Sequence, residues 1–294
     1  MFKRAAKTIS KGGRVLSIFG GALALSAAFF AGPGAAQAQL DRLPELLQVT
    51  GFDNSFDYLP SEMRASMREG ASRNPNLAGN GKFLPAAEVA IDKTLSPAVL
   101  KSLYVQEFAD KLTPDEIGGV IDFYISPLGK RITAMETAAR SPEGKSLLEA
   151  KSPELMEALS NDPDRAQALD RLETALHQID GGVDMALNLT RMLVAGVAAG
   201  NDKVQSLPIE QIDRKLASMR PILILQAQAL SRNSLSFTYH DASIEEINAY
   251  TEFLSSPLGQ KFVSASQAAM TMTTSKAGYD FGHTLMRELG KEPA

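Results

Sequence analysis

One segment of the chain occurs twice, and this repeat constrains the fold more than any other feature of the sequence. Residues 112–139 align without gaps on residues 242–269, at an offset of 130. Each copy combines an apolar helical pattern with the tetrapeptide Ser-Pro-Leu-Gly. The motif residues are Thr113, Glu116, Phe123, Ser126, Pro127, Leu128 and Gly129 in the first copy, and Ser243, Glu246, Phe253, Ser256, Pro257, Leu258 and Gly259 in the second. A recurring pattern of this length predicts one local structure that is built twice.

Both copies predict a helix, a corner and a second helix. Apolar residues recur at helical spacing from Ile117 to Tyr124 in the first copy, which is typical of an amphipathic helix. Thr113 and Ser243 each stand three residues before a glutamate, so we expect a capping box at the start of the first helix. A Ser-Pro pair then starts the second helix, because serine accepts a hydrogen bond from a first-turn N–H and proline at the first helical position loses none.

Gly129 and Gly259 fall in the first turn of that second helix, where glycine costs about 1 kcal/mol relative to alanine. We expect another backbone segment to pass so close that a Cβ would clash. An alternative is an anion site made by the serine, the glycine and the free first-turn N–H groups. A phosphate-binding loop needs a longer glycine-rich stretch and a lysine followed by serine or threonine, whereas Lys130 precedes Arg131. The sequence therefore favours a structural corner.

The segment Phe123–Lys130, which reads Phe-Tyr-Ile-Ser-Pro-Leu-Gly-Lys, resembles the bacterial domain-of-unknown-function family 2059. Phe253–Gln260 carries the same pattern, with Leu254 in place of the tyrosine and Gln260 in place of the lysine. The resemblance implies a helical, exported domain of the bacterial envelope. It implies no catalytic or binding residues.

Residues 1–38 have the pattern of a secretory signal peptide. Basic residues without any acid precede an apolar stretch from Val15 to Ala31, and Ala36-Gln37-Ala38 then supplies a cleavage pattern. We therefore expect cleavage after Ala38 and a periplasmic or secreted protein with no stable membrane span. An alternative is an uncleaved N-terminal anchor, for which this stretch lies at the lower limit of length.

Composition limits the partners and the chemistry. Removal of residues 1–38 takes away five basic residues and changes the formal net charge from −4 to −9. Such an acidic chain has no electrostatic reason to bind nucleic acid. The chain has no cysteine, and its three histidines, His177, His240 and His283, lack metal-ligand spacing. We expect no cofactor and no metal site, and a fold that is stabilised by burial alone.

The remaining chain predicts an all-α fold of two related halves, residues 39–165 and 166–294. Strand patterns are scarce. The tetrapeptide that starts at Leu40 recurs from Leu169, at an offset of 129, so we expect the duplication to extend over both halves. Short helices should meet at the pairs Ser96-Pro97, Ser126-Pro127, Ser141-Pro142, Ser152-Pro153, Asp162-Pro163 and Ser256-Pro257.

Two apolar stretches allow more than one interpretation. The residues from Val183 to Ala199 are apolar on nearly all sides and are bounded by glycines, which is typical of the buried centre of a bundle. The alternative is a membrane helix or a partner-binding helix. Residues 209–232 predict a further helix, which Pro221 should kink or split.

We expect a protein that is not an enzyme, because no catalytic constellation is present. The sequence contains no Gly-x-Ser-x-Gly, no Ser-x-x-Lys and no cysteine nucleophile. The pairs Asp115-Glu116 and Glu245-Glu246 resemble paired carboxylates. Both fall in first helical turns, where negative charge interacts favourably with the helix dipole.

Three functions are consistent with the sequence. The first is a non-catalytic module that binds an envelope protein, since the chain has two copies of one helical unit. The second is a carrier of a small apolar molecule or lipid, which an apolar cavity larger than about 300 Å³ would favour. The third is a hydrolase with a dispersed acidic site, which needs two carboxylates of raised pKa in one cleft.

Overall fold

The computed structural model describes residues 42–73, 81–200 and 209–291. Within these ranges every regular element is a helix and no residue is in a strand, which confirms the all-α prediction. The predicted signal segment, residues 1–38, and its cleavage point after Ala38 lie outside the described residues.

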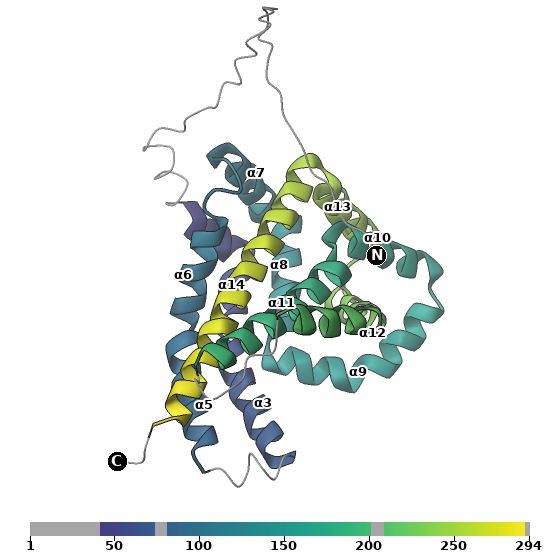
Figure 1. Cartoon of the computed structure of the whole chain (residues 1–294). Coiled ribbons are helices and arrows are strands. Elements are labelled where there is room, and N and C mark those ends of the chain that lie inside the picture. Colours follow the sequence, from purple (N-terminus) through teal and green to yellow (C-terminus); the bar gives the residue numbers. More distant parts are fainter. Residues whose placement is uncertain (1–41, 74–80, 201–208, 292–294) are drawn as a thin grey trace, which may run out of the picture.

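Figure 1 shows how the helices are arranged, and its labels are kept below. Residues 42–49 are helical and precede α2. The helices are α2 (Phe52–Ser55), α3 (Leu59–Arg73), α5 (Phe83–Thr94), α6 (Pro97–Phe108), α7 (Pro114–Ile125), α8 (Pro127–Arg140), α9 (Pro142–Ser160), α10 (Pro163–Leu176), α11 (Gln178–Ala199), α12 (Ile209–Thr238), α13 (Ile244–Ser255) and α14 (Pro257–Leu289).

Five of the six predicted proline corners begin a helix, namely α6, α8, α9, α10 and α14. At four of them the preceding side chain accepts a hydrogen bond from a backbone N–H in the first turn; these side chains are Ser126, Ser141, Asp162 and Ser256. Ser96 has the extended backbone of a cap but makes no such bond. The sixth prediction is wrong, because Pro153 lies inside α9.

The two copies of the motif have the same local structure. The capping boxes at Thr113 and Ser243 are both complete, with the glutamate N–H 3.3 Å and 3.2 Å from the capping oxygen. Ser126 Oγ and Ser256 Oγ each accept a hydrogen bond of 3.1 Å from the glycine three residues later. α7 and α8 therefore form the same corner as α13 and the start of α14.

The glycine of each corner lies against the backbone of the preceding helix. A Cβ at Gly129 would lie 2.2 Å from the Phe123 carbonyl oxygen, and a Cβ at Gly259 would lie 2.1 Å from that of Phe253. Real Cβ atoms do not approach so closely. A side chain at either position would therefore push the two helices of the corner apart.

The two copies also contact each other, and the contacts are reciprocal. The rings of Phe123 and Phe253, which occupy the same place in the repeat, stack with centroids 3.7 Å apart. Arg131 Nε lies 2.8 Å from Glu246 Oε1, and the equivalent pair, Lys261 Nζ and Glu116 Oε1, lies 2.6 Å apart. Such exchange of partners is the mark of a two-fold relation between two like surfaces. The common origin of the complete halves, 39–165 and 166–294, stays a prediction.

α14 runs through the middle of the molecule (Figure 1). It has 33 residues, whereas its counterpart α8 has 14. The extra turns pack against α5 and α6 of the first half and against α11 of the second. Buried residues of both halves consequently belong to a single hydrophobic core, from Leu43 to Leu285.

Glycines allow α11 and α14 to pack closely. Gly196 of α11 and the C-cap residue Gly200 are four residues apart, as are Gly278 and Gly282 of α14, so each pair lies on one helix face. A Cβ at Gly196 would lie 2.0 Å from the Tyr279 carbonyl oxygen. The sequence alone does not reveal this pairing, because small residues are frequent in both helices and nothing local shows which of them face each other.

α11 is not the buried centre that its composition predicted. Val183 and Gly196 are its buried residues, and most of its other side chains are half-buried. In the described part of the chain it is the one helix that is long and apolar enough, by length and composition, to cross a membrane. The core prediction is wrong because the main neighbours of α11 are α14 and α12, so its remaining surface is not covered.

α12 continues through Pro221 as one helix. Of the two predicted effects, the split is wrong and the kink stays a prediction. Its outward side carries four exposed large apolar side chains, Met219, Ile222, Leu225 and Leu230. These four residues are called the α12 apolar face below. The nearby charges are paired with α11, Arg220 with Asp184 and Asp213 with Arg191.

Replacement of Gly129 or Gly259 by leucine should lower the free energy of unfolding by about 3 kcal/mol through overpacking. The added Cβ meets a backbone carbonyl in both cases, so side-chain repacking cannot relieve the clash. Urea unfolding measures the effect. Gly70→Leu in α3 is the matched control, because a Cβ there meets no atom within 4 Å. Equal stability of the Gly129, Gly259 and Gly70 variants would contradict the close-packing account.

Candidate functional site: a cavity between the two halves

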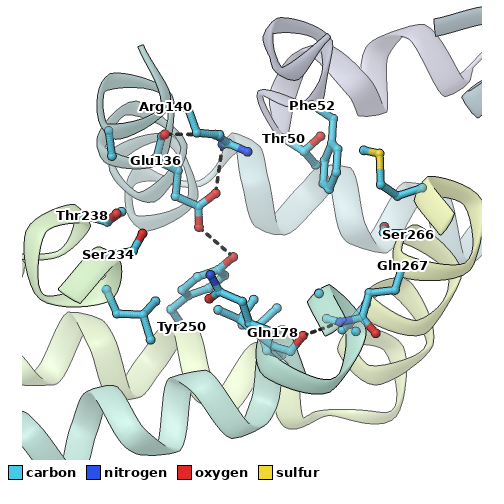
Figure 2. A pocket seen from close by; sticks show the side chains of 18 of the residues that line it. Thr50, Phe52, Glu136, Arg140, Gln178, Ser234, Thr238, Tyr250, Ser266 and Gln267 are labelled. Atoms are coloured by element: carbon cyan, nitrogen blue, oxygen red, sulfur yellow. Dashed lines mark hydrogen bonds and ion pairs between the residues drawn. The ribbon is translucent and has the colours of Figure 1, made fainter. Parts of the chain in front are cut away.

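A cavity of about 480 Å³ opens between the two predicted halves. Its lining combines residues 50–148 with residues 176–271, which come from α2 and α7 to α14 and from the connections beside them. Figure 2 shows these side chains converging on one space. The volume lies within the range of about 300–1,000 Å³ that is typical of small-molecule sites.

One wall of the cavity is apolar. It is formed by the end of α10, by α11, and by the second copy of the motif with the helix that follows it. The side chains of this wall are Leu176, Met185, Leu254, Phe262, Val263 and Met270. Leu254, Phe262 and Val263 are buried and belong to the core, so this wall is fixed by the packing of the molecule.

A network of tyrosine hydroxyls and one carboxylate closes another side. Tyr239 Oη and Tyr250 Oη donate hydrogen bonds of 2.6 Å and 3.2 Å to Glu136 Oε1. Tyr124 Oη lies 3.1 Å from Tyr250 Oη, and it is the donor because the Tyr250 proton points to Glu136. The network joins the first half, through Tyr124 and Glu136, to the second.

All three phenols act as hydrogen-bond donors over the ordinary pH range. Burial raises the pKa of Tyr124, of Tyr239 and of Tyr250, and the negative charge of Glu136 raises each of them further. Protonated phenols can donate to a carboxylate, whereas phenolates would repel it. The network is therefore arranged to hold the charge of Glu136 in place.

Arg140 and Lys145 are the basic residues of the cavity lining. Arg140 is one helical turn after Glu136 on α8, and its Nη2 lies 3.3 Å from Glu136 Oε2. Lys145, in the first turn of α9, pairs with Glu62 of α3. Figure 2 shows Glu136 and Arg140 on one side of the cavity, with Ser266 and Gln267 on the other.

Ser266 is a buried residue of the cavity wall. It is 6% exposed. Burial raises the pKa of Tyr104, and a hydrogen bond with the Ser266 side chain acts in the opposite direction. The neighbouring Gln267 is engaged, since its Nε2 donates to the Leu176 carbonyl oxygen at 2.8 Å. The Ser266 oxygen itself has almost no accessible surface, so this residue supports the wall and is not exposed to an occupant of the cavity.

The motif residues of the sequence analysis do not line this cavity. Thr113, Ser126, Gly129 and their counterparts in the second copy hold the corners instead. Two repeat positions next to the motif, Tyr124 and Leu254, do reach the cavity. Sequence reasoning missed Glu136 and Arg140, although their i, i+4 spacing on an amphipathic helix was a usable signal.

His177, His240, Glu116 and Glu246 make structural contacts and do not line the cavity. His177 has a left-handed backbone with φ of 49° and starts α11, and His240 Nδ1 lies 2.7 Å from the Phe237 carbonyl oxygen within a turn. Glu116 and Glu246 complete capping boxes and pair across the two copies. Among residues 42–73, 81–200 and 209–291, no group of three His, Cys, Asp or Glu side chains could hold a metal ion.

A comparison with protein families agrees with the resemblance seen in the motif. The model of a family described as an uncharacterized protein conserved in bacteria (DUF2059) matches residues 98–158. This range contains the first copy of the motif, and the second copy lies outside it. No curated protein and no solved structure matches the chain.

Replacement of Glu116 by glutamine should cost about 0.5–1 kcal/mol of stability at pH 7, the range of a partly exposed ion pair. Glutamine can keep the capping box, so the loss reports the pair with Lys261. Hydrogen bonds from Lys261 and from the Thr113 backbone lower the pKa of Glu116. The stability that ionised Glu116 contributes is therefore fully present above its pKa in the unfolded chain, about 4.3. It is lost as the pH falls through its lower pKa in the folded protein.

A double-mutant cycle of Glu116→Gln with Lys261→Met, measured by urea unfolding at pH 7 and pH 3, isolates the coupling free energy between these two side chains. We expect a favourable coupling at pH 7 that shrinks at pH 3. A coupling that is absent at pH 7, or as large at pH 3, would show that the pair does not hold the two copies together.

Proposed function

We propose that this protein is a non-catalytic carrier that binds a small amphipathic molecule in the cavity between its halves, in the bacterial periplasm. One observation carries the proposal: a cavity of about 480 Å³ with an apolar wall and a polar side built from separate helices. Pockets of this kind, mostly apolar with a few convergent polar groups, are the usual form of small-molecule sites.

The same cavity lacks the pair of carboxylates that the hydrolase hypothesis needs. Glu136 is the one carboxylate among its lining residues, and it is engaged by Tyr239, Tyr250 and Arg140. General acid–base hydrolysis by paired carboxylates needs a second carboxylate within reach. The acidic pairs of the sequence lie at helix starts instead.

The periplasmic location rests on the sequence. Residues 1–38 have the charge, apolar stretch and small-residue pattern of a cleaved signal peptide. The family matched by residues 98–158 is bacterial. The chain has no cysteine, so its fold does not depend on disulfide formation or exchange. This is compatible with a carrier in the periplasm.

A bulky side chain at Gly182 should abolish binding in the cavity. Gly182 lines the cavity, and a Cβ there meets no atom within 4 Å, so Gly182→Phe fills space without an initial clash. We expect the wild-type protein to bind the neutral fluorescent probe N-phenyl-1-naphthylamine saturably, and the variant to bind it at least about tenfold more weakly, a change of 1.4 kcal/mol.

Gly70→Phe in α3 is the matched control, because Gly70 is also surrounded by open space but lies away from the cavity. This variant should bind the probe as the wild type does. Equal binding by all three proteins, or no saturable binding by the wild type, would count against the carrier function.

A second candidate function, recognition of an envelope protein, is favoured by the α12 apolar face. Ile222, Leu225 and Leu230 are each exposed by 60% or more. The charges nearby are already paired with α11, so the face suits the apolar side of a partner helix.

A photo-crosslinking residue at position 225, tested in living cells, examines this second function. We expect one adduct of defined mass, and its loss when Ile222→Glu is added. The crosslinker at Arg73, an exposed site on α3, is the control and should not give the adduct. Identical patterns at positions 225 and 73 would refute recognition through this face.

A further inference from the structure

Resting on the proposed carrier function, we infer that the ligand of the cavity is an amphiphile with an anionic head, in chemical class an aliphatic carboxylate. Arg140 and Lys145 would hold the head, and the apolar wall would hold the chain. The inference depends on how charge is distributed over the lining.

The charges of the cavity lie together. Glu136, Arg140 and Lys145 are the Asp, Glu, Lys or Arg residues of the lining, and all three come from α8 and the first turn of α9. The wall formed by α11 and α14 contributes Met185, Val263 and Met270 instead. A ligand that is charged at one end and apolar over the rest matches this separation.

The carboxylate of Glu136 is already satisfied. Its Oε1 accepts two phenol hydrogen bonds, and its Oε2 faces Arg140 at 3.3 Å. A cationic head would have to compete with these donors and would also face two positive side chains. The lining therefore carries one net positive charge in a chain whose own formal charge is −4.

Arg140 keeps capacity for a carboxylate. A guanidinium has five N–H donors, and three hydrogen bonds of this side chain stay within the protein. Two of the three are long, at 3.4 Å to Ser55 Oγ and 3.3 Å to Glu136 Oε2. Planar guanidinium groups bind carboxylates through two parallel hydrogen bonds. A carboxylate head bound in this way would form stronger hydrogen bonds with Arg140 than the two long ones present now.

Lys145 can add a second positive contact. Its side chain is 49% exposed and pairs with one carboxylate, Glu62, which does not line the cavity. An ammonium has three donors on a flexible stem. The Lys145 ammonium can therefore reach a bound head group without any change in the fold.

Calorimetric titration of the purified protein with three amphiphiles of equal chain length tests the inference: decanoate, decan-1-ol and decyltrimethylammonium. We expect decanoate to bind at least about tenfold more tightly than the other two. Arg140→Gln and Lys145→Gln should each weaken decanoate binding severalfold and leave decanol binding unchanged. Arg73→Gln, which removes an exposed cation paired with Glu69 on α3, is the matched control and should change neither.

The outcomes separate the two proposals. Binding of decanol or decyltrimethylammonium as tight as that of decanoate would overturn the anionic head but leave the carrier function standing. No binding of any of the three, together with no binding of the neutral probe, would overturn the carrier function itself. Arg140 contacts Glu136, so its variant is also checked by thermal unfolding; the comparison of head groups on the wild type does not depend on it.

Discussion

The contact between the two copies of the repeated corner is the constraint on which the rest of the structure depends. Each corner is tight because serine caps the second helix and glycine lets it lie against the first, with room for no Cβ. The two corners then meet through the stacked Phe123 and Phe253 rings and two reciprocal ion pairs. Both copies contribute equivalent residues to the contact, as the two subunits of a symmetric dimer do, although here the copies belong to a single chain.

The cavity lies next to this contact. Tyr124 of the first copy and Tyr250 of the second are hydrogen-bonded to each other, and the network continues to Glu136. A buried polar network whose members are all satisfied is rigid and favours one arrangement of its surroundings. The tyrosines therefore join the halves and at the same time fix the charged side of the cavity.

Several features of the fold could be predicted from the sequence because they depend on neighbouring residues. Both capping boxes and five of the six proline corners follow from such local chemistry. Pro153 was predicted to start a helix and Pro221 to kink or split one, but α9 and α12 each continue through their proline. A proline inside a helix costs about 3 kcal/mol, and packing of the helix against its neighbours offsets that cost here.

The sequence by itself determined the helices, the corners and the equivalence of the two motif copies, because hydrogen bonds and steric limits within a few residues decide these features. Only the tertiary structure decided that α11 is half-exposed, that α14 crosses from one half to the other, and that Glu136, Arg140 and three tyrosines surround one cavity. Those residues come from helices far apart in the chain. Their meeting depends on which helix faces pack together, and no local pattern encodes that choice.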